Sequence, residues 1–316
     1  MQVIVGSGAV GTAVAELLIA QGERVRVVTR SGGGPDHPLV DLVAADAADP
    51  AALRRIAAGA SVIYNCANPA YHNWPRDWPP LNAAMISAAA DNDAVYAITG
   101  NLYGYGPVDR PMTEDTPLSS AVRKGRVRAK MWQDALAAPI RTLEARASDY
   151  ISPRYSVIDM ALPAMRAGKT ARLPGHPDMP HTYTYVGDVA RTLVTLAQDE
   201  RAWGRAWHVP SPPPMTARDL LRTVARLGGM PEPRIKAYPL PVLRAVALVQ
   251  PFVREFLEVR YQHIHPFVMD SSRVTETFGL THTDLEAAVH AVLGNTPSPS
   301  PSVASGGKDP SKSTME

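Results

Sequence analysis

The chain lacks most of the features that indicate export, a membrane or nucleic acid. Its single cysteine, Cys66, cannot form an intramolecular disulfide, so the fold does not depend on oxidation. The 32 basic and 30 acidic residues leave a net charge of +2, and no block of basic residues suggests a nucleic-acid surface. There is no basic-then-apolar leader, and no apolar run approaches about 18 residues. We therefore expect a cytoplasmic protein with neither a membrane nor a nucleic-acid partner.

Hydrophobic residues make up 45% of the 316 residues, enough to bury a sizeable core. Short apolar segments such as QVIVG at 2–6 alternate with segments of helical spacing such as AVGTAVAELLIAQG at 9–22. This alternation predicts an α/β fold of the Rossmann type, with a doubly wound parallel sheet and helices on both faces. After residue 150 the pattern loosens, which predicts a smaller C-terminal substrate or lid domain.

The same pattern divides the chain into regions. We expect a dinucleotide-binding core over residues 1–150, to which residues 186–210 return. The substrate-binding or lid region is expected over 151–185 and 211–294. Residues 295–316 are polar and rich in proline and serine, so we expect a disordered tail there.

A glycine-rich turn follows the first expected strand and opens the first expected helix. Its three glycines have the spacing G-x-G-x-x-G, in which the first permits a tight turn and the second lets the backbone approach a pyrophosphate. The third lets helix and strand pack closely, and the helix N-terminus then faces the negative charge. We expect this turn to bind a dinucleotide through Gly6, Ser7, Gly8, Ala9, Val10 and Gly11.

The end of the second expected strand indicates which dinucleotide is bound. Enzymes that use NAD usually carry an acidic residue there, whereas this strand ends VVTRS and has no carboxylate. Arg30 and Ser31 are suited to a 2′-phosphate, so we expect NADP(H), with NAD(H) as the alternative. Asp46 follows the third expected strand and is a candidate contact to the adenine; a surface turn is nearly as good an interpretation.

Four motifs together resemble the extended and atypical short-chain dehydrogenase/reductases, the group that includes nucleotide-sugar epimerases and dehydratases. They are GSGAVG, NCANP, TGNLYGYGP and YTYVGDVA, and the resemblance runs from residue 1 to about 294. It implies a Rossmann core with a smaller substrate domain. It also implies that Ala67 and Asn68, in the second motif, contact the cofactor.

The resemblance further implies a Ser/Thr, Tyr and Lys constellation, in which lysine holds the nicotinamide ribose and tyrosine moves the proton. Counting from LYGYG places Thr99 at the Ser/Thr position and Lys130 at the lysine position. The tyrosine position is then Arg126, which is always charged and a poor acid, although it can stabilise an oxyanion. A second register pairs Ser120 with Lys124, but serine is a weak acid.

Another group must therefore supply the proton. Tyr103 lies just beyond the strand that carries Thr99, and His72 lies in the segment NPAYHNW and titrates near neutral pH when unperturbed. A packing tyrosine and a solvated histidine are the simpler interpretations of these two residues. A third route uses a phenol of the substrate itself beside the ketone, with the enzyme supplying orientation and hydride.

The segment PAYHNWPRDWPP indicates the kind of substrate. Its rings stand on a stiff proline-rich loop, which suits a flat aromatic ligand, although a hydrophobic plug under a lid fits equally well. We expect substrate contacts from Tyr71, Trp74, Trp78 and Asn101.

We expect no metal site, because the spacing of the histidines in the sequence does not match a metal-binding motif. The segment HIH places His263 and His265 on one side of an extended stretch, but the sequence suggests no third ligand.

These observations together predict an NADPH-dependent ketoreductase that acts on a bulky, aromatic, polyketide-type molecule without the family's tyrosine. In this respect the chain resembles the angucyclinone ketoreductases that tailor aromatic polyketides. Two alternatives stay open: a nucleotide-sugar epimerase or dehydratase, and a redox sensor that binds NADP without turnover. The oligomeric state, monomer or homodimer, is also open.

Overall fold

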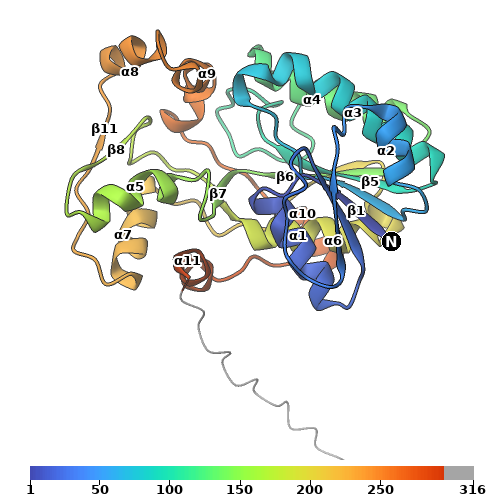
Figure 1. Ribbon diagram of the computed structural model, residues 1–316. Coiled ribbons are helices and arrows are strands. Elements are labelled where there is room, and N and C mark those ends of the chain that lie inside the picture. Colours follow the sequence, from blue (N-terminus) through green and yellow to red (C-terminus); the bar gives the residue numbers. More distant parts are fainter. Residues whose placement is uncertain (295–316) are drawn as a thin grey trace, which may run out of the picture.

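The computed structural model describes residues 1–294, and the expected disordered tail at 295–316 lies outside the described residues. Within that range the main sheet has seven strands, all paired in parallel, in the order β10-β6-β5-β4-β1-β2-β3. The expected α/β fold with a doubly wound parallel sheet is confirmed (Figure 1). The strands are β1 (Gln2–Val5), β2 (Val25–Thr29), β3 (Val40–Ala44), β4 (Val62–Asn65), β5 (Val95–Asn101), β6 (Thr142–Ala147) and β10 (Arg205–His208).

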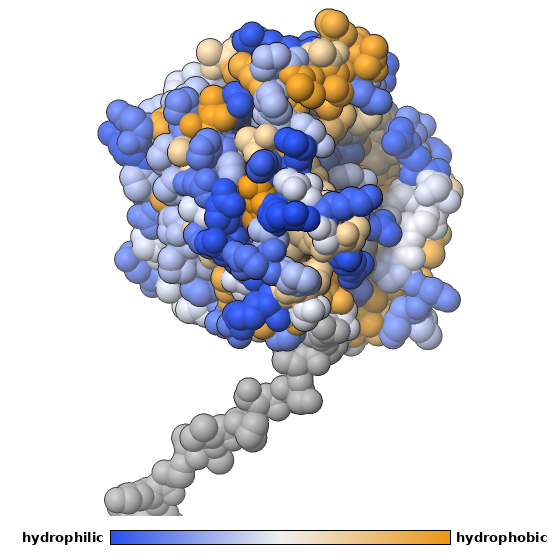
Figure 2. All heavy atoms as spheres, turned by 90° about the vertical axis from the view of Figure 1, so that its left-hand side faces the viewer, coloured by the Kyte–Doolittle hydropathy of each residue, from blue (hydrophilic) through white to orange (hydrophobic). Residues whose placement is uncertain are grey.

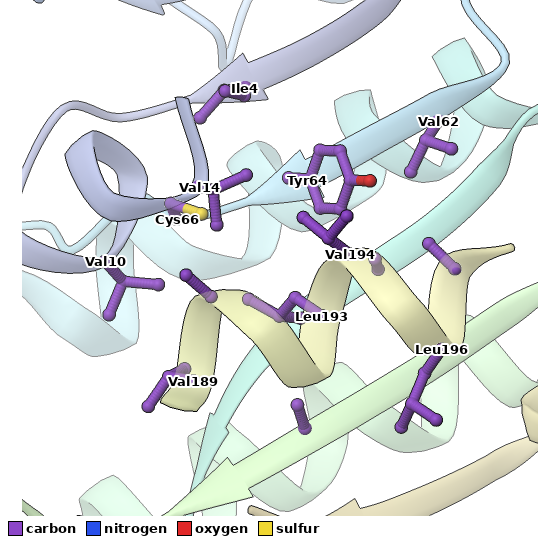
Figure 3. Packing of buried hydrophobic residues seen from close by; sticks show 14 of the residues in the cluster. Ile4, Val10, Val14, Val62, Tyr64, Cys66, Val189, Leu193, Val194 and Leu196 are labelled. Carbon is purple, nitrogen blue, oxygen red and sulfur yellow. The ribbon is translucent and has the colours of Figure 1, made fainter. Parts of the chain in front are cut away.

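Two helical layers cover the sheet, one on each face. The helices are α1 (Ala9–Ala20), α6 (Val186–Ala197) and α10 (Ser272–Phe278) on one face, and α2 (Pro50–Ile56), α3 (Trp74–Asp91) and α4 (Arg123–Ala137) on the other. On the first face, Val14 of α1 and Leu193 of α6 pack with Tyr64 of β4 in one buried cluster (Figure 3). Since both faces of the sheet are covered, its central strands β1 and β4 are buried along their whole length.

Local sequence signals set the ends of several helices. Asp49 accepts hydrogen bonds from the backbone N–H groups of Ala51 and Ala52 at the start of α2. Thr216 accepts one from the N–H of Asp219 at the start of α7. Both are side-chain N-caps, which satisfy N–H groups that have no partner within the helix.

The remaining elements stand on one side of this core, at the left of Figure 1. A separate hydrophobic cluster joins α5, α7 and α11 with the short strands β7, β8 and β11. The strand pairs β7–β9 and β8–β11 form two small parallel sheets. The bounds are β7 (Asp149–Ile151), β8 (Ala171–Leu173), β9 (Tyr183–Tyr185), β11 (Ile235–Ala237), α5 (Val157–Arg166), α7 (Ala217–Leu227), α8 (Leu240–Ala247), α9 (Pro251–Val259) and α11 (Leu285–Leu293), with short 3-10 turns η1 (Tyr71–Asn73), η2 (Glu200–Ala202) and η3 (Arg260–His263).

Helix α9 covers the start of α4, and the segment of α8 and α9 leaves apolar side chains in solvent. Figure 2 shows hydrophobic residues gathered at the top of the molecule, the level at which α8 and α9 lie in Figure 1. The exposed large apolar side chains of this segment are Val242, Val246, Leu248, Val249 and Phe252. No helix of residues 1–294 has both the length and the apolar character needed to span a membrane.

One expectation about local structure is wrong. The tryptophans of PAYHNWPRDWPP lie in α3, which begins at Trp74 and runs through Pro79 and Pro80, rather than in a loop. Trp74 and Trp78 are four residues apart, so they share one helix face, and both are buried in the core beneath the sheet. Burial of these two large rings offsets the unfavourable prolines.

Candidate functional site

The glycine turn between β1 and α1 has the geometry of a phosphate cradle. Gly6 has φ +101°, and a Cβ added to Gly11 would lie 2.0 Å from the carbonyl oxygen of Gly6, so both positions require glycine. A Cβ on Gly8 would meet nothing within 4 Å. The N-terminus of α1 also has no side-chain cap, which leaves its N–H groups for an anion. Gly8 therefore faces open space at an uncapped helix N-terminus, where a dinucleotide pyrophosphate fits.

The other expected cofactor residues follow neighbouring strands at the same edge of the sheet. Arg30 and Ser31 come directly after β2 and are exposed, and Asp46 comes after β3 and is also exposed. Ala67 and Asn68 come after β4, which lies on the other side of β1. Because the carboxyl ends of parallel strands meet at one edge, all five flank the glycine turn. The Asp46 carboxylate accepts a hydrogen bond from the N–H of Ala48 at 3.0 Å.

Helix α4 presents different residues to the interior from those expected. Arg126 and Lys130 are exposed, and Lys130 pairs with Asp134 one turn further along the helix surface. The buried pair with the four-residue spacing is Lys124 and Arg128, two positions earlier. The expectation that Lys130 and Arg126 face the site is therefore wrong, because the helix turns these two side chains toward solvent.

Lys124 is fully buried and held by the lid helix α9. Its ammonium group pairs with the carboxylates of Glu255 and Glu258, and it lies 4.6 Å from the ring centre of Tyr71. Glu258 also accepts a hydrogen bond from the backbone N–H of Lys124 at 2.8 Å, so α9 supplies a cap for α4. Burial would raise the pKa of Glu255, but Lys124 and Arg123 together bring it below its usual value.

Arg128 and Thr99 lie next to each other at the end of β5. The guanidinium of Arg128 donates a hydrogen bond to the carbonyl oxygen of Thr99 and lies 3.8 Å from the carboxylate of Glu144. The Thr99 hydroxyl donates to the Cys66 sulfur at 3.7 Å, and burial raises the pKa of that thiol to about 12. Since the carbonyl oxygen of Cys66 lies against Gly6, Thr99 is linked to the glycine turn through one residue.

Two tyrosine hydroxyls meet beside Lys124. Tyr71 donates a hydrogen bond to the hydroxyl of Tyr103 at 2.9 Å, and burial raises the pKa of both phenols well above the usual value. Both therefore stay protonated at neutral pH. Asn101 accepts a hydrogen bond from the backbone N–H of Tyr103 at 3.1 Å and so shapes this turn. His72, the other expected proton donor, is exposed on η1.

The expected substrate-binding aromatics separate into two groups. Tyr71 lies 5.8 Å from Phe252 of α9, measured between ring centres, at a partly exposed position. Trp78 is 1% exposed, and the guanidinium of Arg128 lies 5.2 Å from its ring centre. Trp78 therefore belongs to the core and cannot line a substrate pocket. Trp74 is also buried, and its ring stacks on that of Tyr103 with 5.9 Å between ring centres. It therefore packs against the tyrosine pair.

A second cluster, missed by the sequence analysis, joins Asp149, His181 and His263. The Nε2 atom of His181 lies 3.2 Å from the Asp149 carboxylate, and Nδ1 of His263 lies 3.6 Å from the same oxygen. Burial would raise the pKa of Asp149, but the two imidazoles lower it to about 2. Burial lowers the pKa of His263 to about 4. The sequence suggested only the pair in HIH, and the fold keeps His263 and replaces His265, which is exposed, with residues from β7 and the segment before β9.

The chain belongs to the NAD dependent epimerase/dehydratase family, whose model matches residues 3–209. Similar solved structures include WbmH of Bordetella bronchiseptica in complex with NAD⁺, at 19% identity and a TM-score of 0.73, covering 93% of this chain and 97% of that one. UDP-glucose 4-epimerase of Thermotoga maritima with UDP-glucose has 16% identity and a TM-score of 0.76, covering 93% and 98%. No match was found among the curated proteins.

A third similar structure is DesIV of Streptomyces venezuelae, a dTDP-glucose 4,6-dehydratase with NAD and DAU bound. It has 15% identity and a TM-score of 0.69, covering 93% of this chain and 98% of that one. At these identities the matches establish the fold of the matched part of the chain, and they leave its substrate and chemistry open.

Proposed function

We propose that the protein is an NADP(H)-dependent reductase that reduces a ketone of a bulky aromatic molecule. The cofactor assignment rests on the open cradle at Gly8 and on the strand end after β2, where Arg30 and Ser31 stand in place of a carboxylate. An exposed guanidinium at this point suits a 2′-phosphate, which it can bind with two parallel hydrogen bonds.

The observation that carries the proposal is the tyrosine pair beside Lys124. No tyrosine lies on α4, but the hydroxyls of Tyr71 and Tyr103 are joined at 2.9 Å beyond the strand that carries Thr99. When bound at the glycine turn, NADPH would supply the hydride that reduces the carbonyl carbon. The carbonyl π bond then breaks, and the oxygen takes the proton of the Tyr103 hydroxyl. Tyr71 returns a proton to Tyr103 through the hydrogen bond between them and is reprotonated from solvent.

Burial raises the pKa of both phenols, so each carries the proton that a donor needs but gives it up less readily than a free phenol. An alkoxide formed by hydride addition is a stronger base than a phenolate, so a protonated phenol can neutralise it. The ammonium group of Lys124, 4.6 Å from the Tyr71 ring, then stabilises negative charge that reaches Tyr71. Lys124 serves as a fixed charge in this scheme, because Glu255 and Glu258 already hold it.

An aromatic substrate is supported by the rings around this pair. Tyr71 packs edge-on against Trp74 at 5.0 Å and lies against Phe252, whose side chain is 59% exposed on the lid helix. Rings from η1 and from α9 thus approach each other across the site. A flat molecule can replace part of this ring-to-ring packing with its own faces when the lid shifts.

The first experiment measures affinities of NADPH, NADH, NADP⁺ and NAD⁺ by calorimetry, for the wild type and Arg30→Ala. We expect NADPH to bind tightest, and the variant to lose about tenfold or more for NADPH while NADH is unchanged, since a charged hydrogen bond contributes about 1.5–3 kcal/mol. Equal loss for both cofactors would remove the 2′-phosphate assignment.

The second experiment follows NADPH consumption with quinones and phenol-flanked ketones. We expect turnover, and we expect Tyr103→Phe to lower kcat by about 10²–10⁴. Tyr155→Phe is the matched control, because Tyr155 is 81% exposed. Unchanged kcat in Tyr103→Phe would shift the proton donor to the substrate's own phenol or to His72. Cofactor binding without turnover on any ketone would favour the redox sensor.

A second candidate function is a nucleotide-sugar epimerase or dehydratase. The family membership favours it. So does the similarity to an epimerase solved with UDP-glucose and to a dTDP-glucose 4,6-dehydratase. Against it stand Arg30 after β2 and the inner face of α4, where Lys124 occupies the turn that would need a tyrosine. Conversion of UDP-glucose or dTDP-glucose by the purified protein, with NAD⁺ preferred over NADP⁺, would replace the ketoreductase proposal.

A further inference from the structure

The cluster of Asp149, His181 and His263 has the ligand set and spacing of a metal site. We infer that these three residues bind a divalent transition metal ion of the zinc class. One carboxylate oxygen and two imidazole nitrogens converge, and the three atoms lie within 4.8 Å of one another. Two histidines and one carboxylate form a recognised three-ligand set for zinc, with a fourth position left open.

The two distances from Asp149 to the imidazole nitrogens are close to those around a tetrahedral ion. With metal–ligand bonds of about 2.1 Å, two ligands of a tetrahedral ion lie about 3.4 Å apart. The Asp149 oxygen lies 3.2 Å from His181 Nε2 and 3.6 Å from His263 Nδ1. A direct charge-assisted hydrogen bond between imidazolium and carboxylate is shorter, about 2.7–2.9 Å. The two observed separations, 3.2 and 3.6 Å, are longer than that and bracket the ligand spacing of a tetrahedral ion.

The hydrogen bonding of His181 points in the same direction. Its Nδ1 atom lies 3.1 Å from the backbone carbonyl oxygen of Gln262, which can only accept, so Nδ1 carries the proton. When the ring is neutral, Nε2 therefore carries a lone pair, and the nearby Asp149 carboxylate also offers only lone pairs. Nε2 is buried and has no hydrogen-bond partner among the described residues. A histidine that donates one ring N–H to a carbonyl while the other nitrogen binds metal is the usual arrangement at metal sites.

The backbone around the cluster fixes the ligands in place. Asp149 is paired with Tyr183 in the small parallel sheet of β7 and β9. His181 is held by hydrogen bonds in both directions with Met215, and the carbonyl of His263 accepts from His176 at 2.7 Å. Because the fold already holds these ligand residues in place, metal binding does not have to order them first.

The three ligands also differ in exposure as an open metal site requires. The His181 side chain is 3% exposed, whereas those of Asp149 and His263 are 33% and 23% exposed. Aromatic rings pack on both histidines: His181 stacks on Phe267, His263 stacks on Phe256, and the two imidazoles stack on each other with 5.4 Å between ring centres. An ion can therefore enter from the side of Asp149 and His263, where a water molecule or substrate atom completes its shell.

The test is metal binding by the full-length protein after treatment with a chelator, with no cofactor or substrate present. Zn²⁺ is bound by equilibrium dialysis and counted by mass spectrometry, and Co²⁺ is titrated while its visible absorption is followed. We expect about one equivalent of metal and d–d bands of a four- or five-coordinate ion. The variants are Asp149→Asn, His181→Asn and His263→Asn. The matched control is His265→Asn, from the same HIH segment but exposed.

Each ligand variant should lose at least about tenfold in Zn²⁺ affinity, and the control should be unchanged. If His181→Asn does not fold, His263→Asn at the partly exposed ligand decides the result. Absence of stoichiometric metal in the wild type, or equal affinity in His263→Asn and His265→Asn, would overturn the inference. Its outcome is independent of the proposed ketone reduction, because no turnover is measured.

Discussion

The buried lysine at the start of α4 gives a sharp test of how this part of the molecule is held. Replacing Lys124 with methionine removes an ammonium group that is fully buried between Glu255 and Glu258. Breaking a buried pair typically costs about 3–5 kcal/mol, because the remaining charge has lost its partner. Arg123 still pairs with Glu255 at 2.9 Å, which moderates the loss, whereas the lost contact with the Tyr71 ring adds to it. We therefore expect Lys124→Met to lower the free energy of unfolding by about 3–4 kcal/mol.

The assay is urea unfolding of the wild type, Lys124→Met and Lys130→Met. Lys130 forms only an exposed pair with Asp134, so its replacement should cost at most about 0.5 kcal/mol. The double variant Lys124→Met with Glu255→Gln should be more stable than Lys124→Met alone, since it removes one of the two carboxylates that would otherwise share Arg123 as their cation. The reasoning is refuted if the two lysine variants differ by less than about 1 kcal/mol. It is also refuted if Glu255→Gln costs as much in the Lys124→Met variant as it does in the wild type.

Three further outcomes follow from the same structure. Gly11→Ala should lower the free energy of unfolding, measured in urea, by about 3 kcal/mol or more. The reason is that its Cβ would lie 2.0 Å from the carbonyl oxygen of Gly6. Gly8→Ala should leave stability within about 0.5 kcal/mol of the wild type and weaken dinucleotide binding in calorimetry, since its Cβ enters the open cradle. Burial lowers the pKa of His208 to about 3, so the unfolded chain binds the extra proton below its pKa of about 6.5, and stability is lost as pH falls from 6.5 toward 3. Between pH 7.5 and 4.5 His208 alone should account for a loss of about 2–3 kcal/mol, so His208→Gln should lose that much less than the wild type; equal pH slopes in both proteins would contradict it.

The sheet and its cofactor edge could be predicted from sequence because each depends on local pattern. Apolar segments of period two between helical segments define the parallel sheet, and a glycine that needs φ +101° marks the turn after β1. Asp49 and Thr216 were identifiable as caps, since a capping side chain acts within three residues of its own position. None of these inferences requires knowledge of tertiary contacts.

The cluster around Asp149 could not be predicted in this way. Its members come from β7, from the segment before β9 and from η3, and they meet only because the fold brings these segments together. In the sequence, His263 and His265 look equivalent, since both belong to HIH. The contact of Gly175 with His263 and the hydrogen bond from His176 decide which of them turns inward.

Which side of α4 faces the interior could be predicted from the position of its apolar residues, although not from a four-residue spacing alone. Trp132 lies on the buried face of the helix, and steps of one turn back from it reach Arg128 and then Lys124. The apolar stripe therefore selects this pair over Arg126 and Lys130, which lie on the opposite face. Two cations inside a stripe that otherwise packs against the core are costly, and sequences keep such residues mainly where function or a specific partner requires them. Lys124 has such partners in Glu255 and Glu258 of α9, and its ammonium group also lies against the ring of Tyr71.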